Sequence, residues 1–203
     1  MSEPRARASR LARVAPGLVH WTVRDDRIDA RSDAYAVAGR RGAVLIDPLP
    51  LTDAALARIG PVEAICLTGS CHQRSSWRYR RRLGAPVYAP SGARGLEERP
   101  DVAYADRAPL PGGLVAVHAP GPARVHFALH SRTGRGALFC ADVLTRDAAG
   151  VRFVDPEYQD DPELTRSTAG RLVRLRFAVL CFAHGAPLTT GAKPAMRAAT
   201  ASG

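Results

Sequence analysis

Short runs of apolar and β-branched residues alternate with polar turns along most of the chain, a pattern typical of β-strands. These runs predict strands at 18–23, 35–37, 43–46, 64–68, 86–89, 115–118, 124–130, 136–140 and 177–182. Capping residues, and a proline at one helix start, predict helices at 54–59, 77–83 and 161–174. Residues 25–33 read as a polar connection, and Gly39-Arg40-Arg41-Gly42 reads as the turn of a hairpin.

The order of these elements predicts the fold class. Hairpins and strand–helix–strand crossovers occur in the same chain, which favours an α/β sandwich of mixed β-sheets over a doubly wound parallel sheet. The 203 residues suit a single domain of ordinary size. We expect a flexible N-terminal arm at 1–10, one domain at 11–194 and a frayed tail at 195–203, because the tail is small and polar.

Composition limits the class of protein further. Hydrophobic residues make up 46% of the chain and charged residues 24%, as in globular proteins, so disordered and fibrous classes fit poorly. No apolar stretch reaches the roughly 20 residues of a membrane span, and the arginine-rich start lacks the apolar run of a secretory signal. The four cysteines stand apart without a CxxC pair, which favours free thiols. We therefore expect a cytoplasmic protein with no membrane partner.

Basic residues outnumber acidic ones, which gives a formal net charge of +10. All of them except Lys193 are arginines, a bias expected from a GC-rich genome; an anionic partner is the competing explanation. Aromatic residues make up only 6%, so few surfaces are available for base stacking, which argues against nucleic acid. A small anionic molecule is the remaining candidate partner.

Residues that can bind a metal or transfer protons follow several predicted strands. Asp47, the Cys71-His72 pair, Asp142 and His184 each come soon after a strand, where the loops of α/β proteins usually carry their sites. Taken singly, each also has a structural explanation, since aspartate forms turns and histidine occurs on surfaces. The chain contains no GxGxxG or GxxxxGK[ST] motif, so dinucleotide-binding and P-loop classes have no support.

Five segments occur in a characteristic order. They are Leu45-Ile46-Asp47-Pro48, Ile65-Cys66-Leu67-Thr68 with the histidine-containing loop after it, the Pro120-Gly121 turn, Phe139-Cys140-Ala141-Asp142 and Phe182-Ala183-His184-Gly185. Across about 11–193 this series resembles the metallo-β-lactamase superfamily. The resemblance implies an αβ/βα four-layer sandwich of two mixed β-sheets with helices on the outer faces. It also implies one or two metal ions, usually zinc or iron, and hydrolysis of an ester, amide, thioester or phosphodiester bond.

The chain departs from the family pattern at most metal-ligand positions. In active members the loop after the second buried strand reads Thr-His-x-His-x-Asp-His. With Thr68 as the anchor, the four ligand positions of that motif hold Gly69, Cys71, Gln73 and Arg74. The next family histidine falls on Pro122, which offers no ligand. The resemblance therefore implies that most of a dinuclear site is missing.

Three positions match the family's residues. Asp142 matches the aspartate that bridges two metals, His184 matches the final histidine, and Asp47 matches an aspartate that orients the site from behind the ligands. His72 is one residue out of register, although a small shift of its loop would turn it inward. Cys71, His72, Asp142 and His184 would then form a mononuclear site, and their thiolate, imidazole and carboxylate groups suit zinc.

Arg74 supports a different interpretation, because its guanidinium could pair with Asp142 and replace a metal by its own positive charge. The leading hypothesis is a degenerate protein related to hydrolases of small ester, thioester or lactone substrates, with its dinuclear site largely lost. One alternative is a mononuclear zinc hydrolase. The other is a metal-free module that binds an anionic ligand or a protein. Enzyme and binding-module classes therefore both stay open.

The helix predicted at 77–83 is rich in arginine and contains no acidic residue. Arg78 and Arg81 share one side of it by their spacing and are candidate ligands for an anion at the mouth of the pocket. The alternative is a solvated helix face. The histidines of the middle strands, His118, His126 and His130, are expected to be packing or surface residues.

Overall fold

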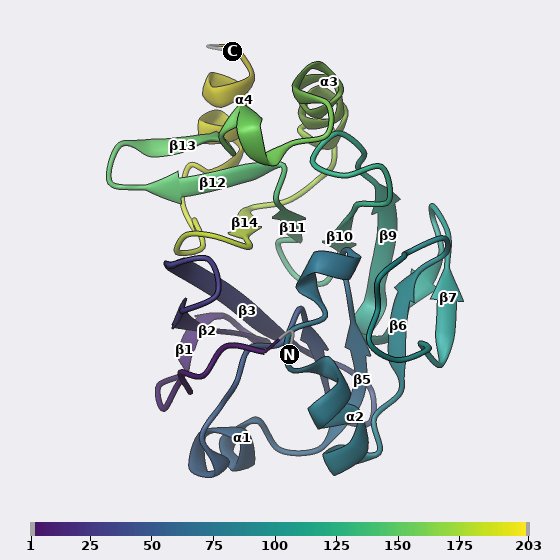
Figure 1. The fold of residues 1–203 in the computed structure, drawn as a ribbon. Coiled ribbons are helices and arrows are strands. Elements are labelled where there is room, and N and C mark those ends of the chain that lie inside the picture. The colour runs from purple at the N-terminus through teal and green to yellow at the C-terminus, as the bar shows by residue number, and fades with distance from the viewer. Residues whose placement is uncertain (1–2, 202–203) are drawn as a thin grey trace.

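The computed structural model describes residues 3–201, and its elements follow the predicted order (Figure 1). The strands are β1 Ala12–Ala15, β2 Leu18–Asp25, β3 Ala30–Ala38, β4 Ala43–Ile46, β5 Val62–Cys66, β6 Val87–Pro90, β7 Val102–Tyr104, β8 Pro109–Leu110, β9 Leu114–His118, β10 Phe127–Ser131, β11 Ala137–Ala141, β12 Leu144–Asp147, β13 Gly150–Phe153 and β14 Val179–Phe182. The α-helices are α1 Asp53–Ile59, α2 Ser76–Leu83, α3 Pro162–Leu172 and α4 Ala192–Ala201. Every predicted strand and helix is present, with bounds that differ by a few residues.

The first sheet runs in the order β1 to β7 and combines two kinds of pairing. Strands β1 to β4 pair antiparallel through hairpins, whereas β4 to β7 run parallel to one another. Helices α1 and α2 make the crossovers that parallel neighbours need. The Thr52 side chain caps α1 by accepting the Ala55 N–H, and Gly84 ends α2 in a left-handed conformation.

The second sheet runs in the order β14-β11-β10-β9-β8, and β12 and β13 form a separate hairpin. Strand β10 pairs antiparallel with β9 and β11, while β11 and β14 are parallel. The mixture of hairpins and crossovers predicted from the sequence is therefore confirmed in both sheets.

Three hydrophobic clusters separate four layers. Trp77 packs in the cluster between the first sheet and helices α1 and α2, and Phe139 packs in the cluster between the two sheets. Met196 lies in the third cluster, between the second sheet and helices α3 and α4. Neighbouring residues of β4 face opposite sides, since Leu45 belongs to the first cluster and Ile46 to the second. The predicted four-layer αβ/βα sandwich is thus confirmed.

One stretch expected to be a polar connection is part of the first sheet. Residues 30–33 belong to β3, and Asp25, Ser32 and Asp33 are buried. Their burial escapes a search for apolar runs because these side chains have hydrogen-bond partners in place of apolar neighbours.

The two end segments contact the rest of the chain. In the segment expected to be an arm, the Ala8 N–H donates to the Pro50 carbonyl (2.9 Å) and the Ala8 carbonyl accepts the Thr52 N–H (3.0 Å). In the expected tail, residues 195–201 belong to α4 and bury Met196; residues 202–203 lie outside the described part. No helix within residues 3–201 is long and apolar enough to cross a membrane.

Candidate functional site

The loop after β5 is anchored to the end of β4. The Thr68 N–H donates to Asp47 Oδ1 (2.8 Å), and the Thr68 hydroxyl donates to Asp47 Oδ2 (2.6 Å). Asp47 itself has a left-handed backbone (φ 45°). Such a conformation costs about 1–3 kcal/mol and persists only where the surroundings fix the residue. The carboxylate of Asp47 therefore has a defined position behind the loop.

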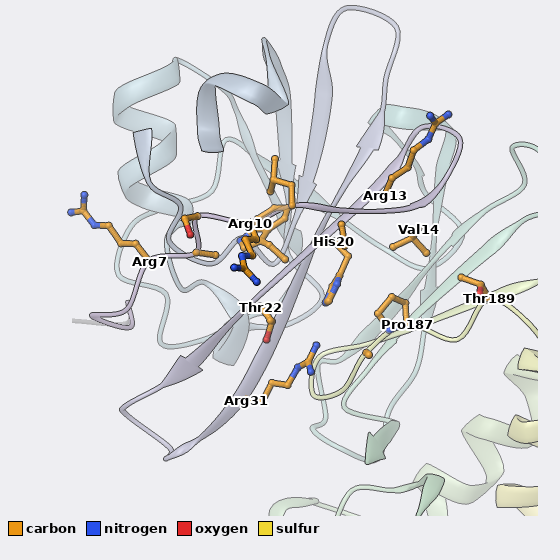
Figure 2. A pocket seen from close by; sticks show the side chains of 15 residues that line it. Arg7, Arg10, Arg13, Val14, His20, Thr22, Arg31, Pro187 and Thr189 are labelled. Atoms are coloured by element: carbon orange, nitrogen blue, oxygen red, sulfur yellow. The ribbon is translucent and has the colours of Figure 1, made fainter. Parts of the chain in front are cut away.

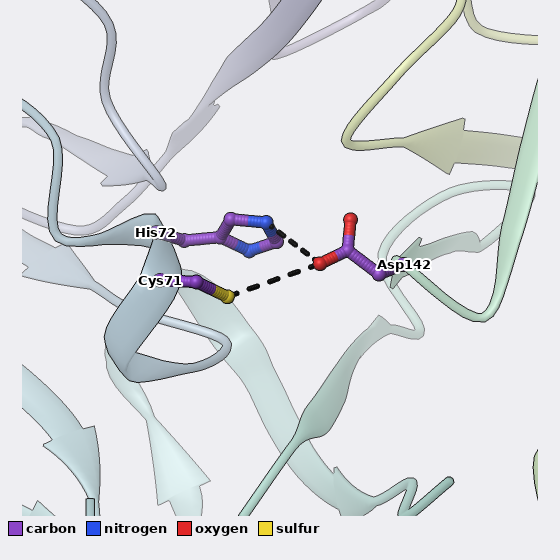
Figure 3. A group of neighbouring side chains, drawn as sticks. All are labelled: Cys71, His72 and Asp142. Atoms are coloured by element: carbon purple, nitrogen blue, oxygen red, sulfur yellow. Dashed lines mark hydrogen bonds and ion pairs between the residues drawn. The ribbon is translucent and has the colours of Figure 1, made fainter. Parts of the chain in front are cut away.

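His72 turns inward from this loop. A short 3₁₀ helix, Ser70–His72, buries its imidazole at 3% exposure. Nδ1 lies 2.7 Å from the Thr68 hydroxyl oxygen and 3.2 Å from Asp47 Oδ2, so Nδ1 carries a proton and donates it to them. Nε2 lies 3.0 Å from Asp142 Oδ2 (Figure 3). His72 thus faces the site, although the sequence motif places it one residue out of register.

Cys71 approaches the same carboxylate from the exposed side of the loop. Its Sγ lies 3.9 Å from Asp142 Oδ2 (Figure 3). One ligand-type atom from each of Cys71, His72 and Asp142 lies within 4.8 Å of the others. Around a tetrahedral zinc ion with bonds of about 2.0–2.3 Å, ligand atoms lie about 3.3–3.7 Å apart. The observed spacings, 3.0 Å from His72 and 3.9 Å from Cys71 to Asp142, lie on either side of this range, so small shifts of the side chains would bring the three groups around one cation.

Asp142 is the residue on which these contacts converge. It directly follows β11, after Ala141 in a left-handed conformation (φ 49°). Its backbone N–H donates to His126 Nε2 (3.3 Å), and His126 Nδ1 donates to the Ala119 carbonyl (2.8 Å). The side-chain oxygen Oδ1 of Asp142 is buried and has no hydrogen-bond partner among the described residues. One oxygen of the carboxylate therefore lacks the partner that buried polar atoms normally have.

His184 faces this unpartnered oxygen. Its Nδ1 donates to the Arg31 carbonyl (2.7 Å), which fixes the proton on Nδ1 and leaves Nε2 toward Asp142. Nε2 lies 3.6 Å from Asp142 Oδ1, too far for a hydrogen bond. The following Gly185 has φ 128°, and a Cβ there would lie 2.3 Å from the Arg146 carbonyl oxygen. Only glycine permits the turn that directs His184 to this position.

The charges of the site depend on burial and on Asp142. Burial lowers the pKa of His72, but the negative charges of Asp142 and Cys71 outweigh it and hold that pKa well above its usual value. Burial raises the pKa of Asp142, yet the charge and hydrogen bond of His72 bring it well below its usual value. Burial also lowers the pKa of His184 and of His126. In the protein alone, His72 and Asp142 therefore form an imidazolium–carboxylate pair.

Arg74 has contacts different from the pair with Asp142 that the sequence predicts. Its backbone is left-handed (φ 37°), and Nη1 donates to the carbonyl oxygens of Asp33 (2.9 Å) and Asp47 (3.3 Å). The guanidinium thus connects β3 with the end of β4, while the partner of Asp142 at hydrogen-bond distance is His72. Arg74 is 3% exposed and lines the same cavity as the candidate ligands.

A second buried carboxylate, Asp33 on β3, joins the two sheets beside His184. It lies 2.6 Å from His20 Nε2, 2.7 Å from the Gly185 N–H nitrogen and 3.0 Å from the Arg31 guanidinium. Burial raises the pKa of Asp33, but the hydrogen bonds from His20, Arg31 and Gly185 outweigh it, and the pKa is lowered. The Gly185 N–H, which follows His184, is held in place by this carboxylate.

Sequence reasoning missed two residues of this region. Asp33 fell in the expected polar connection, and no local signal marks it, because a polar residue among polar neighbours reads the same on a loop and in a buried strand. His126 was expected to be a packing or surface residue, as were His118 and His130. His126 lies immediately before β10 and shortly after the Pro120-Gly121 turn. This position in the sequence could have marked it as a residue of the site.

A cavity of about 710 Å³ opens onto these groups, a size typical of small-molecule sites. Its lining includes Cys71, His72, Asp142 and His184, together with Arg27, Arg74 and Arg152. Arg78 and Arg81 do not belong to this lining, and they pair with Glu3 and Glu98 respectively. Their role as anion ligands stays a prediction.

The fold has many counterparts among solved structures. A metallo-beta-lactamase family protein from Thermus thermophilus superposes with a TM-score of 0.71 at 19% identity, over 94% of this chain and 80% of its own. An archaeal metallo-beta-lactamase superfamily protein from Sulfolobus tokodaii gives 0.67 at 18% identity, over 84% and 79%. A metallo beta lactamase from Erythrobacter litoralis gives 0.70 at 13% identity, over 95% and 92%.

This chain is therefore a protein of the metallo-β-lactamase fold, as the order of its sequence segments predicts. At 13% to 19% identity the likeness establishes the fold. No protein-family model matches the chain, and none of the curated proteins matches its sequence. The site itself brings together a small group of one cysteine, one histidine and one aspartate.

Proposed function

We propose that this protein binds a single metal ion, zinc by the chemistry of its donors, and hydrolyses a small ester, thioester or lactone. Cys71, His72, Asp142 and His184 would hold the ion. The observation that carries the proposal is the carboxylate of Asp142. Its Oδ2 faces His72 and Cys71, while its buried Oδ1 has no hydrogen-bond partner within residues 3–201 and faces His184 Nε2 at 3.6 Å.

The donor groups fit a cation in two respects. A positive ion beside Asp142 Oδ1 would supply the partner that this oxygen lacks. Both histidines use Nδ1–H to donate to protein oxygens, so that Nε2 is the nitrogen left for a metal. Binding would require Nε2 of His72 to lose its proton, and the ion would then take the place of that proton beside the carboxylate.

The structure offers few donors for a second ion. Gln73, at the motif position of an aspartate ligand, is fully engaged elsewhere: its amide nitrogen donates to the Gly95 carbonyl, and its oxygen accepts the Trp77 indole N–H and the Glu97 N–H. Gly69 and Pro122 have no side-chain donor, and Arg74 is a cation. These contacts support one metal position in place of the family's two.

The roles of the residues follow from their contacts. A bound zinc ion would supply Lewis-acid polarisation of a substrate carbonyl. Asp47 and Thr68 fix the ring of His72, and the Arg31 carbonyl fixes the ring of His184. Arg74 places a permanent positive charge in the wall of the cavity, where it would stabilise negative charge that develops on a substrate.

A second candidate function is a metal-free site for a small anion. The observation that favours it is the direct His72–Asp142 pair at 3.0 Å, which is complete without a metal. Arg74 lines the cavity together with Arg27 and Arg152, which pair with Asp25 and Asp155 of the same lining. A carboxylate or phosphate would take the place of these acidic partners.

Metal analysis by inductively coupled plasma mass spectrometry decides between the two. The protein should be purified without chelator and without a nickel column, alongside His184→Ala and the control His118→Ala, which alters a histidine away from the site. We expect about one zinc per chain in the wild type and the control, and a large loss in His184→Ala.

A metal-free wild type that also shows no rise in melting temperature on addition of zinc would overturn the first function. Binding of inorganic phosphate or acetate to that metal-free protein would then support the second. If zinc is present, hydrolysis of a nitrophenyl ester, an acyl thioester and a lactone should disappear with a chelator and return with zinc. Failure of all three substrates would contradict hydrolysis while leaving the metal site intact.

A further inference from the structure

A groove of about 850 Å³ runs along the N-terminal segment (Figure 2). It is lined by residues 7–14, residues 20–22 of β2, Arg31, Ala186, Pro187 and Thr189. We call it the arm groove. None of its lining residues also lines the cavity of the candidate metal site. It lies where the edge strand β1 of the first sheet approaches the loop after β14, the edge strand of the second.

All the charged residues that line the arm groove are positive. Its lining contains Arg7, Arg10, Arg13 and Arg31 and no acidic residue. The first three are exposed and form no ion pair in the described part of the chain. Arg31 pairs with Asp33 at 3.0 Å, and its side chain remains 48% exposed. The three positive charges without an ion-pair partner, in a lining that contains no acidic residue, favour an anionic partner.

Helix α2 is a useful contrast, because it is equally rich in arginine. There each arginine has an acidic partner: Arg78 pairs with Glu3, Arg80 with Glu98 and Asp101, Arg81 with Glu98, and Arg82 with Asp53. A codon bias toward arginine affects both segments alike. Arg7, Arg10 and Arg13 differ from the arginines of α2 in that they line a groove without an acidic residue.

The spacing of the unpaired arginines suits an extended ligand. They stand three residues apart on an extended stretch, which bridges to Leu51 at Ala8 and enters β1 at Ala12. At about 3.3 Å per residue, the stretch from Arg7 to Arg13 covers about 20 Å. Figure 2 shows Arg7 and Arg13 at opposite ends of the view, with Arg10 between them. A chain with several carboxylates can reach all three, whereas one small anion cannot.

Backbone and apolar groups add to this arrangement. Strand β1 has β2 as its sheet neighbour and lies at the edge of its sheet in the described residues, so one row of its N–H and C=O groups is open to a further strand. Leu11, Val14 and Pro187 provide apolar surface between the guanidinium groups. Peptides that add to a sheet edge use both kinds of contact, with backbone hydrogen bonds along the edge and side chains in flanking pockets.

We propose that the arm groove binds an extended acidic peptide segment of a partner protein, with carboxylates on Arg7, Arg10 and Arg13. Single-stranded nucleic acid fits less well, because its binding sites use exposed aromatic rings for stacking. The rings that line the arm groove are buried: Trp21 is 1% exposed and His20 is 6% exposed. This site does not depend on whether the cavity holds a metal.

The test uses a fluorescein-labelled octapeptide of alternating glutamate and threonine, followed by fluorescence anisotropy. The variant Arg10→Glu with Arg13→Glu cancels the net positive charge of the arm-groove lining, because two arginines and two glutamates then remain. Its matched control, Arg40→Glu with Arg197→Glu, makes the same change of net charge at exposed arginines of the β3–β4 turn and of α4. We expect the arm-groove variant to bind at least about tenfold more weakly than the wild type, and the control to bind within about twofold of it.

Three results would overturn the proposal: no binding to the wild type, equal weakening in both variants, or tighter binding of a ten-nucleotide thymidine oligomer than of the peptide. Hydrogen exchange locates the site without any substitution. The peptide should slow exchange of the amides in residues 7–14, and protection confined to other segments would contradict the arm groove as the binding site.

Discussion

The two halves of the candidate metal site differ in how they keep their side chains. The half from the second sheet, Asp142 after β11 and His184 after β14, holds the residues expected at their family positions. In the half from the first sheet, the loop after β5 brings Cys71 and His72 beside Asp142, although this loop does not follow the motif expected from the sequence. Asp47 and Thr68 hold this loop in place through three hydrogen bonds shorter than 3 Å.

The difference teaches that the backbone of this site and its side chains are held in place by different contacts. Asp47, Arg74 and Ala141 have left-handed backbones, a conformation that persists only where the surroundings hold it in place. The imidazoles of His72 and His184 are held by separate contacts, through hydrogen bonds from Nδ1 to the Thr68 hydroxyl and to the Arg31 carbonyl. With the loop anchored in this way, Cys71 and His72 both lie beside Asp142, although the loop sequence differs from the expected motif.

The largest loss of stability is expected from Asp142→Asn, a change in the second-sheet half of the site. Asparagine keeps the shape but removes the negative charge that pairs with buried His72, and removal of one partner of a buried ion pair costs about 3 kcal/mol or more. Urea unfolding in the presence of a chelator measures this loss without any contribution from metal. The exposed Asp155, which pairs with Arg152, gives the control Asp155→Asn, which should change stability little. Equal losses in both variants would mean that the His72–Asp142 pair does not stabilise the fold.

Arg74→Met tests the first-sheet half. The buried carbonyl oxygens of Asp33 and Asp47 would lose a donor, so the free energy of unfolding should fall by about 2 kcal/mol. Zinc should bind more tightly, because a positive charge next to the ion is removed. Isothermal titration of the chelator-treated protein checks the second effect. Arg74→Lys restores the charge, and its zinc affinity should stay at the wild-type level; a rise there as well would contradict the electrostatic explanation.

The sequence predicts the apolar frame of this molecule well and its polar interior poorly. Runs such as Ala43–Ile46 and Val179–Phe182 are continuous, and local pattern alone identifies them as buried strands. Short or mixed elements such as β1 and α4 lack that pattern. His72 turns inward because it contacts Asp47 and Asp142, which are 25 and 70 residues away in the sequence. Such contacts exist only once the sheets have packed.

The loss of folding stability at low pH should depend on Asp33, whose carboxylate on β3 accepts the Gly185 N–H after β14 and so connects the two sheets. Its pKa in the folded protein lies below the ordinary value of 3.8. Its charged form therefore contributes stability that is complete well above that value and is lost as the pH falls toward the folded pKa. Urea unfolding from about pH 6 to about pH 3 should show a shallower loss of stability in Asp33→Asn than in the wild type. The variant should also be less stable at the upper end of this range. Parallel curves would show that Asp33 does not contribute to the acid sensitivity.

Cys71→Ser is expected to have the smallest effect on stability. It also tests most directly whether the first-sheet half contributes a metal ligand. Cys71 is exposed, and its contact with Asp142 is a long sulfur–oxygen approach of 3.9 Å, so unfolding in the presence of a chelator should be almost unchanged. Serine lacks the thiolate that zinc prefers, so zinc affinity should fall markedly if the first-sheet half contributes a ligand. A variant that keeps both its stability and its zinc affinity would assign the metal to His72, Asp142 and His184 alone. Cys71 would then be an exposed loop residue and not a metal ligand.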